Sequence, residues 1–138
     1  MTGTQATTAR FVVTGSESYD SMQGSHYAPG ISAATSGASH LFLGIVTLAP
    51  GQRTKAHVHE QHESAHYMLS GEEVELWCGA RLEQREIARP GDYLFTPAGM
   101  PHVAVNRSAK PAVFVTARND PTAQESVSMR PELDALVP

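Results

Sequence analysis

Residues 91–106, GDYLFTPAGMPHVAVN, contain two tight-turn signals and a histidine at the start of a predicted strand. Gly91 follows a proline, a combination that lets the chain reverse with a positive φ, and residues 97–99 (Pro-Ala-Gly) preset a second sharp turn. The chain after this turn is predicted to re-enter the protein as a strand. Because side chains alternate along a strand, His102 and Asn106 share one face, which we expect to point inward.

A second histidine-rich stretch lies upstream at residues 51–71, GQRTKAHVHEQHESAHYMLSG. Side chains repeat with a period of two in a strand, so His57 and His59 point the same way. Two imidazoles on one face form a bidentate clamp for a metal ion. The acids and imidazoles that follow are donors of the kinds that borderline divalent metals prefer.

Together the two stretches resemble the paired sequence motifs of the cupin family. The first motif is matched by Gly51, His57, His59, Glu63 and Gly71. The second is matched by Gly91, Pro97, Gly99, His102 and Asn106. The resemblance covers residues 40–117 and implies an all-β fold, the antiparallel cupin double-stranded β-helix or RmlC-like jelly-roll barrel.

The pattern of the whole chain agrees with that fold. From residue 40 onward, short apolar or alternating segments are separated by Gly and Pro signals, which is typical of an all-β sandwich or barrel. We expect a barrel core over residues 40–117, an N-terminal arm over 1–39 that could exchange between subunits, and a tail over 118–138 that packs on the barrel. The predicted strands are His40–Leu48, Arg53–His59, His66–Ser70, Val74–Cys78, Glu83–Ala88, Tyr93–Thr96, His102–Asn106, Ala112–Ala117 and an edge strand near Gln124–Met129.

Three inward imidazoles in a barrel interior need a ligand that compensates for their burial, and a metal ion provides it. We therefore predict one divalent transition metal per subunit, Fe(II), Mn, Zn or Ni, held by His57, His59 and His102. A polar network in the core without metal is the alternative.

The acidic ligand of the family is harder to place. Counting forward from His59 puts it at Glu63, whereas counting back from Gly71 puts it at Ser64, because the interval is one residue longer than the usual pattern. A bulge could absorb the extra residue. The forward spacing favours Glu63 as a metal ligand, and His62 is its rival.

His66 follows in the next predicted strand. If Tyr67 and Leu69 face outward, His66 and Met68 face into the barrel. An imidazole beside the metal ligands could serve as a catalytic acid/base group. The alternative is a histidine that only packs in the strand.

Composition excludes several classes of protein. The chain has 138 residues, a formal net charge of −4 and no run of Lys or Arg, so nucleic acid is an unexpected partner. The longest apolar stretch, 41–49, is too short to cross a bilayer, and no membrane span is expected. Residues 1–10 have no apolar signal region, so a cytoplasmic location is expected.

The resemblance favours a metal-dependent enzyme acting on a small organic molecule. With Fe(II), cupin dioxygenases imply oxidative cleavage of a small aromatic, diketone or thiol. With Zn, Mn or Ni, the ion could act as a Lewis acid in an isomerase, lyase or polyketide cyclase. A non-catalytic metal- or ligand-binding protein is the third possibility. The long N-terminal arm also suggests a homodimer.

Overall fold

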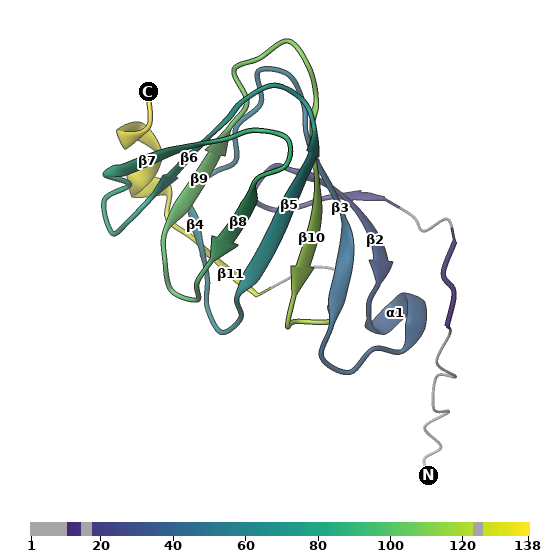
Figure 1. The fold of residues 1–138 in the computed structure, drawn as a ribbon. Coiled ribbons are helices and arrows are strands. Elements are labelled where there is room, and N and C mark those ends of the chain that lie inside the picture. Colours follow the sequence, from purple (N-terminus) through teal and green to yellow (C-terminus); the bar gives the residue numbers. More distant parts are fainter. Residues whose placement is uncertain (1–10, 15–17, 123–125) are drawn as a thin grey trace.

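The computed structural model describes residues 11–14, 18–122 and 126–138, and its strands form two antiparallel sheets that face each other (Figure 1). In spatial order, the six-stranded sheet consists of β1 (Tyr19–Asp20), β2 (His26–Ile31), β3 (Phe42–Leu48), β10 (Ala112–Arg118), β5 (Ser64–Ser70) and β8 (Tyr93–Thr96). The five-stranded sheet consists of β11 (Val127–Met129), β4 (His57–His59), β9 (His102–Val105), β6 (Val74–Cys78) and β7 (Gln84–Ala88).

The order of the strands is that of a jelly roll. From β3 to β5 and again from β7 to β11, successive strands alternate between the two sheets, so neighbours in a sheet are distant in sequence. The expected all-β antiparallel class is confirmed. In the described part of the chain, however, the sheets are separate hydrogen-bonded units, so the closed barrel that the pattern predicts is instead a two-sheet sandwich.

Most predicted strands occur within two residues of their expected bounds, and β6 and β8 have the bounds that the sequence predicts. The predicted strand over 53–59 shortens to β4, and Arg53 keeps only an isolated bridge to Val105. The arm predicted over 1–39 contributes β2, which pairs with β3 of the same chain. Exchange of this arm between subunits stays a prediction.

Alternation within the strands places the main core between the sheets. In β3, Phe42, Val46 and Leu48 are buried, while Leu43 on the other face is exposed. The remaining buried members of this core are Tyr27, Met68, Val74, Ala88, Ala112 and Phe114.

A second apolar cluster lies on the outer side of the five-stranded sheet. There the C-terminal 3-10 helix η1 (Pro131–Leu136) covers the sheet with Leu133 and the following Val137, which pack in one cluster with Val103 and Val105. The guanidinium of Arg53 donates to the carbonyl oxygens of Val137 and residue 134 at 2.9 and 3.1 Å. The tail is therefore held against the sheet by both burial and hydrogen bonds.

The helical segments of the described residues are short. The α-helix α1 (Ala33–Ser36) has four residues and η1 has six, so neither could cross a membrane.

Gly71, the last glycine of the first motif, sits where only glycine fits. Its φ is +119°, and a Cβ there would lie 2.9 Å from the carbonyl oxygen of Pro111. Any other side chain would strain the backbone and collide with the loop before β10. This explains why the motif requires a glycine at the turn between β5 and β6.

Candidate metal centre

The structure brings His57, His59 and His102 together in the interior. His57 and His59 lie two residues apart on β4, and the antiparallel pairing of β4 with β9 sets His102 opposite His57. The ring centroid of His102 lies 4.1 Å from that of His57 and 4.7 Å from that of His59. One ring nitrogen from each residue lies within 4.8 Å of the other two, so the cluster could bind a metal ion.

Hydrogen bonds fix which nitrogen His57 and His102 present. Nδ1 of His57 lies 2.6 Å from the carbonyl oxygen of Lys55, and Nδ1 of His102 lies 2.9 Å from that of Met100. A carbonyl oxygen can only accept, so Nδ1 carries the hydrogen in both rings and Nε2 keeps its lone pair. Orientation of a histidine through its second nitrogen is the usual arrangement at metal sites. The residues present therefore fit a divalent transition metal.

Burial disfavours the charged form of His102, one of the three rings in this cluster. Removal from water, with the adjacent His57 and His59 rings as further causes, holds the pKa of His102 well below its usual range. A neutral imidazole can bind a metal ion without first releasing a proton.

Glu63 is not brought to the three histidines. Its side chain is exposed in the turn before β5, and its backbone N–H donates to Oδ1 of Asn119 at 3.0 Å. The alternative position, Ser64, is only 2% exposed, and its hydroxyl lies 3.3 Å from Nδ1 of His59. Ser64, the position counted back from Gly71, therefore places a hydroxyl beside the cluster. Among the described residues, the group that could bind a metal contains no carboxylate.

His62 supports the cluster from the side. It is 3% exposed, and its ring stacks on the ring of His59 with centroids 4.6 Å apart and planes 14° apart. Its Nδ1 lies 3.7 Å from Oδ2 of Asp120. His62 is not one of the three mutually close donors, so its geometry is that of a residue that positions His59.

His66 lies on the interior face of β5, as its phase predicts. Met68, two residues on, is fully buried, while the intervening and following residues face outward and Leu69 is 48% exposed. Nδ1 of His66 lies 2.8 Å from Oγ1 of Thr116. The ring therefore shares the interior with the three-histidine cluster but belongs to the opposite sheet.

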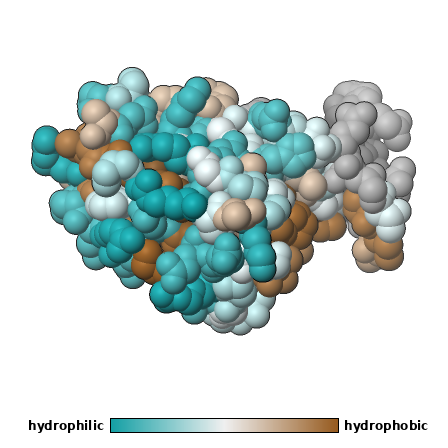
Figure 2. Space-filling model, turned by 90° about the horizontal axis from the view of Figure 1, so that it is seen from above, coloured by the Kyte–Doolittle hydropathy of each residue, from teal (hydrophilic) through white to brown (hydrophobic). Residues whose placement is uncertain are grey.

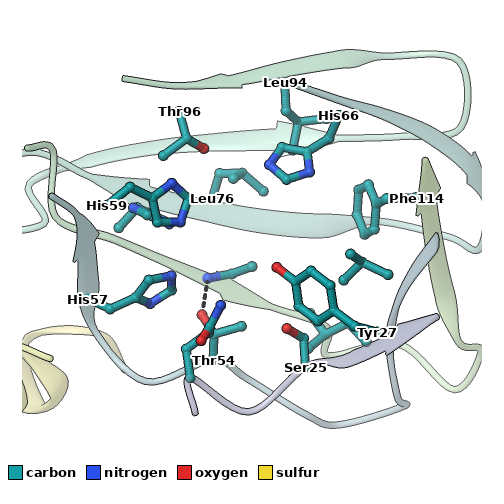
Figure 3. A pocket seen from close by; sticks show the side chains of 15 residues that line it. Ser25, Tyr27, Thr54, His57, His59, His66, Leu76, Leu94, Thr96 and Phe114 are labelled. Atoms are coloured by element: carbon teal, nitrogen blue, oxygen red, sulfur yellow. Dashed lines mark hydrogen bonds between the residues drawn. The ribbon is translucent and has the colours of Figure 1, made fainter. Parts of the chain in front are cut away.

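A cavity of about 80 Å³ lies next to these histidines (Figure 3). His57 and His59 lie at one end, and Tyr27 and Phe114 lie at the other. A single water needs roughly 10–15 Å³ on this measure, so the cavity suits a small molecule. None of its described lining residues is Asp, Glu, Lys or Arg. The lining residues are Gln23, Ser25, Tyr27, Val46, Leu48, Thr54, His57, His59, His66, Leu76, Leu94, Thr96, His102, Ala104 and Phe114.

Sequence reasoning missed two parts of this site. Gln23, Ser25 and Tyr27 come from the N-terminal segment, whose Ser- and Gly-rich composition gives no periodic signal. Asp120 beside His62 comes from the tail. Both segments reach the site only through pairing with residues far away in the sequence.

Comparison with known families gives one clear match. A family model described as a cupin domain matches residues 44–118, which is more than half of the chain. A search of curated proteins found no match.

Three solved structures illustrate the similarity of fold. An oxalate decarboxylase from Lactobacillus farciminis, in a formate complex, has a TM-score of 0.67 at 17% identity over 88% of this chain and 36% of that one. A recombinant oxalate oxidase in complex with glycolate has a TM-score of 0.66 at 18% identity, and the match covers 87% of this chain and 62% of that one. The protein TT1209 from Thermus thermophilus has a TM-score of 0.54 at 33% identity, and the match covers 68% of this chain and 83% of that one. The chain thus spans about a third of the length of the decarboxylase.

Proposed function

Because the chain belongs to the cupin family and three buried imidazoles converge beside an interior cavity, we propose that it is a metal-dependent enzyme acting on a small organic molecule, and specifically a non-haem dioxygenase. The observation that carries the proposal is the pairing of the cluster with a cavity. A purely structural metal site is closed by its ligands, whereas a catalytic site keeps room for a substrate.

The metal would supply an electrophilic centre that, in the case of Fe(II), also takes part in dioxygen chemistry. The chain supplies three neutral donors and no carboxylate in this cluster, so the ion would keep its full positive charge. That charge favours a substrate with an anionic oxygen donor, such as an enolate, a phenolate or a carboxylate.

The cavity walls favour a substrate with an apolar body. Leu76, Leu94 and Phe114 offer apolar surface, and no described lining residue carries a charge that could neutralise a second anionic group. A buried carboxylate without a partner is costly. The substrate class that fits is a compact molecule with one anionic head at the histidine end and an apolar body, such as a small diketone or phenolic compound.

His66 is placed to act as an acid/base group. Its Nδ1 is engaged with Oγ1 of Thr116, which fixes the ring plane, and the ring lines the cavity. We expect His66→Phe to keep the metal content of the native protein and to lower turnover by roughly a hundredfold to ten-thousandfold. His40→Phe, at an exposed histidine outside the cavity lining, is the matched control. Loss of the ion in His66→Phe would make His66 a ligand, and unchanged turnover would return it to a packing role.

A second candidate is Lewis-acid chemistry in an isomerase, lyase or polyketide cyclase. The observation that favours it is the donor set itself, because three imidazoles also suit zinc. A closed structural metal site is disfavoured by the cavity beside the cluster.

Metal substitution separates these functions. Protein loaded in turn with Fe(II), Mn, Zn and Ni is incubated with a panel of phenolics and diketones while dioxygen uptake and substrate loss are followed. The dioxygenase proposal expects dioxygen uptake that matches substrate loss with Fe(II) alone, and none in His102→Ala. Substrate loss with Zn and no dioxygen uptake would establish Lewis-acid chemistry instead. No conversion with any metal and any substrate would contradict the enzyme proposal.

A further inference from the structure

The turn between β1 and β2 places a glutamine inside the cavity. The two strands pair as a hairpin, and the backbone N–H of Gly24 donates to the carbonyl oxygen of Ser21 at 3.1 Å, which closes the turn. Turn residues normally lie on the surface. Met22 does so and is 56% exposed, but Gln23 beside it is only 3% exposed and lines the cavity.

Hydrogen bonds hold this turn beside the histidine cluster. The carbonyl oxygen of Gln23 accepts from the backbone N–H of Lys55 at 2.7 Å. The carbonyl oxygen of Gly24 accepts from the side-chain amide of Gln52. The carbonyl oxygen of Lys55 lies 2.6 Å from Nδ1 of His57. Lys55 therefore contacts both Gln23 and His57, so the turn joins the cavity wall at its histidine end.

The side-chain amide of Gln23 has no partner within the described part of the chain. Two other polar side chains on this wall do have partners. The hydroxyl of Ser25 lies 3.1 Å from that of Ser21. The hydroxyl of Thr54 accepts from the backbone N–H of Ala104 at 2.9 Å, the bond drawn as a dashed line in Figure 3. The Gln23 amide is therefore available to a molecule in the cavity.

The burial of this amide needs a physical reason. A polar group that leaves water without replacing its hydrogen bonds destabilises the fold. Polar side chains elsewhere remain in water, since hydrophilic residues predominate on the surface of the molecule seen from above (Figure 2). The inward position of Gln23 is explained if a ligand in the cavity completes its hydrogen bonds.

We propose that Gln23 recognises a second oxygen of the substrate. In the proposed function, on which this assignment rests, an anionic oxygen of the substrate lies at the metal. An amide offers an acceptor oxygen and two N–H donors without net charge, so it can pair with a neutral hydroxyl or carbonyl. The substrate class therefore narrows to small molecules with two nearby oxygens, one anionic and held by the metal, the other neutral and held by Gln23.

Binding of simple probes to zinc-loaded protein tests this role without turnover, because zinc has no redox chemistry. Phenol has one oxygen, and catechol and resorcinol add a second hydroxyl at neighbouring positions of the same ring. Isothermal titration calorimetry gives each dissociation constant. The variant Gln23→Met keeps the length of the side chain and removes the amide. The matched control is Gln84→Met, at an exposed glutamine of β7 outside the cavity lining.

We expect native protein and Gln84→Met to bind catechol or resorcinol about tenfold more tightly than phenol. In Gln23→Met this preference should disappear, while the affinity for phenol and the zinc content stay native. The melting temperature of Gln23→Met without a probe should equal or exceed that of native protein, because an apolar side chain replaces a buried amide that has no partner.

Several results would overturn the proposal. Native protein could bind neither dihydroxy probe more tightly than phenol. A preference that survives in Gln23→Met would come from chelation of the metal, and weaker phenol binding in that variant would mean a changed cavity shape. Loss of zinc in Gln23→Met would make Gln23 a metal ligand, and a lower melting temperature would give it a structural role. The proposed function is judged by conversion and this assignment by binding, so either can fail without the other.

Discussion

Asn106, the last residue of the second motif, should be among the most costly positions to change. It is fully buried, and its amide nitrogen donates to the carbonyl oxygens of Leu48, Ala49 and Lys110 at 3.0, 3.2 and 2.8 Å. Its Oδ1 accepts from the backbone N–H and the hydroxyl of Ser108 at 3.1 and 2.7 Å. One side chain thus ties the end of β3 to the loop before β10.

The expected loss follows from these bonds. A net hydrogen bond contributes about 1 kcal/mol, and a buried acceptor left without its donor costs more. Asn106→Ala should therefore lower the free energy of unfolding by about 3 kcal/mol, which corresponds to a melting temperature lower by roughly 10 °C for a chain of this size. Asn106→Asp keeps the shape but turns a carboxylate toward three carbonyl oxygens, so it should cost at least as much.

Urea unfolding of chelator-treated protein, followed by circular dichroism, measures the loss without a contribution from bound metal. Asn119→Ala is the matched control, because its Oδ1 accepts a single bond from the backbone of Glu63 in an exposed turn. We expect that control to lose less than about 1 kcal/mol. An Asn106→Ala loss no larger than that of the control would refute the role assigned to the buried amide.

Two further predictions concern residues around the site and the surface. Glu63→Gln should leave metal content unchanged because Glu63 is exposed. His62→Ala should weaken metal affinity by roughly 10–100-fold without abolishing it, because the His62 ring stacks on that of His59. Loss of the ion in Glu63→Gln, measured by elemental analysis, would show that Glu63 is a ligand. The hydrogen bond from Arg107 is the main cause that lowers the pKa of Glu75 from 4.5 to about 2, so this carboxylate stabilises the fold above pH 4.5 and the benefit is lost as pH falls toward 2. Acid unfolding of Glu75→Gln should lack that part of the pH dependence, and an unchanged acid-unfolding curve would count against the ion pair.

The sequence predicted the histidine cluster because local periodicity decides it. His57 and His59 need only a strand to share a face, and the turn around residues 97–99 returns the chain so that His102 meets them. The phase of His66 follows from the same period of two. These features depend on neighbours within one strand or one turn.

Other features depend on contacts that periodicity does not encode. β2 looked like part of a polar arm, yet its pairing with β3 brings Tyr27 into the cavity. The irregular turn after β4 decides which residue lies beside the histidine cluster, so motif spacing alone could not choose between Glu63 and Ser64 as the candidate ligand. Closure of a barrel likewise depends on pairing between distant edge strands, and β7 and β8 lie at the edges of separate sheets.

Elemental analysis of protein purified without chelators tests the three-histidine site most directly. We predict about one divalent transition metal ion per chain, and loss of the ion in His57→Ala, His59→Ala and His102→Ala, since each removes one of three donors that lie within 4.8 Å of one another. Native protein without stoichiometric metal, even after incubation with Fe(II), Mn, Zn or Ni, would contradict the site, as would full metal content in all three variants.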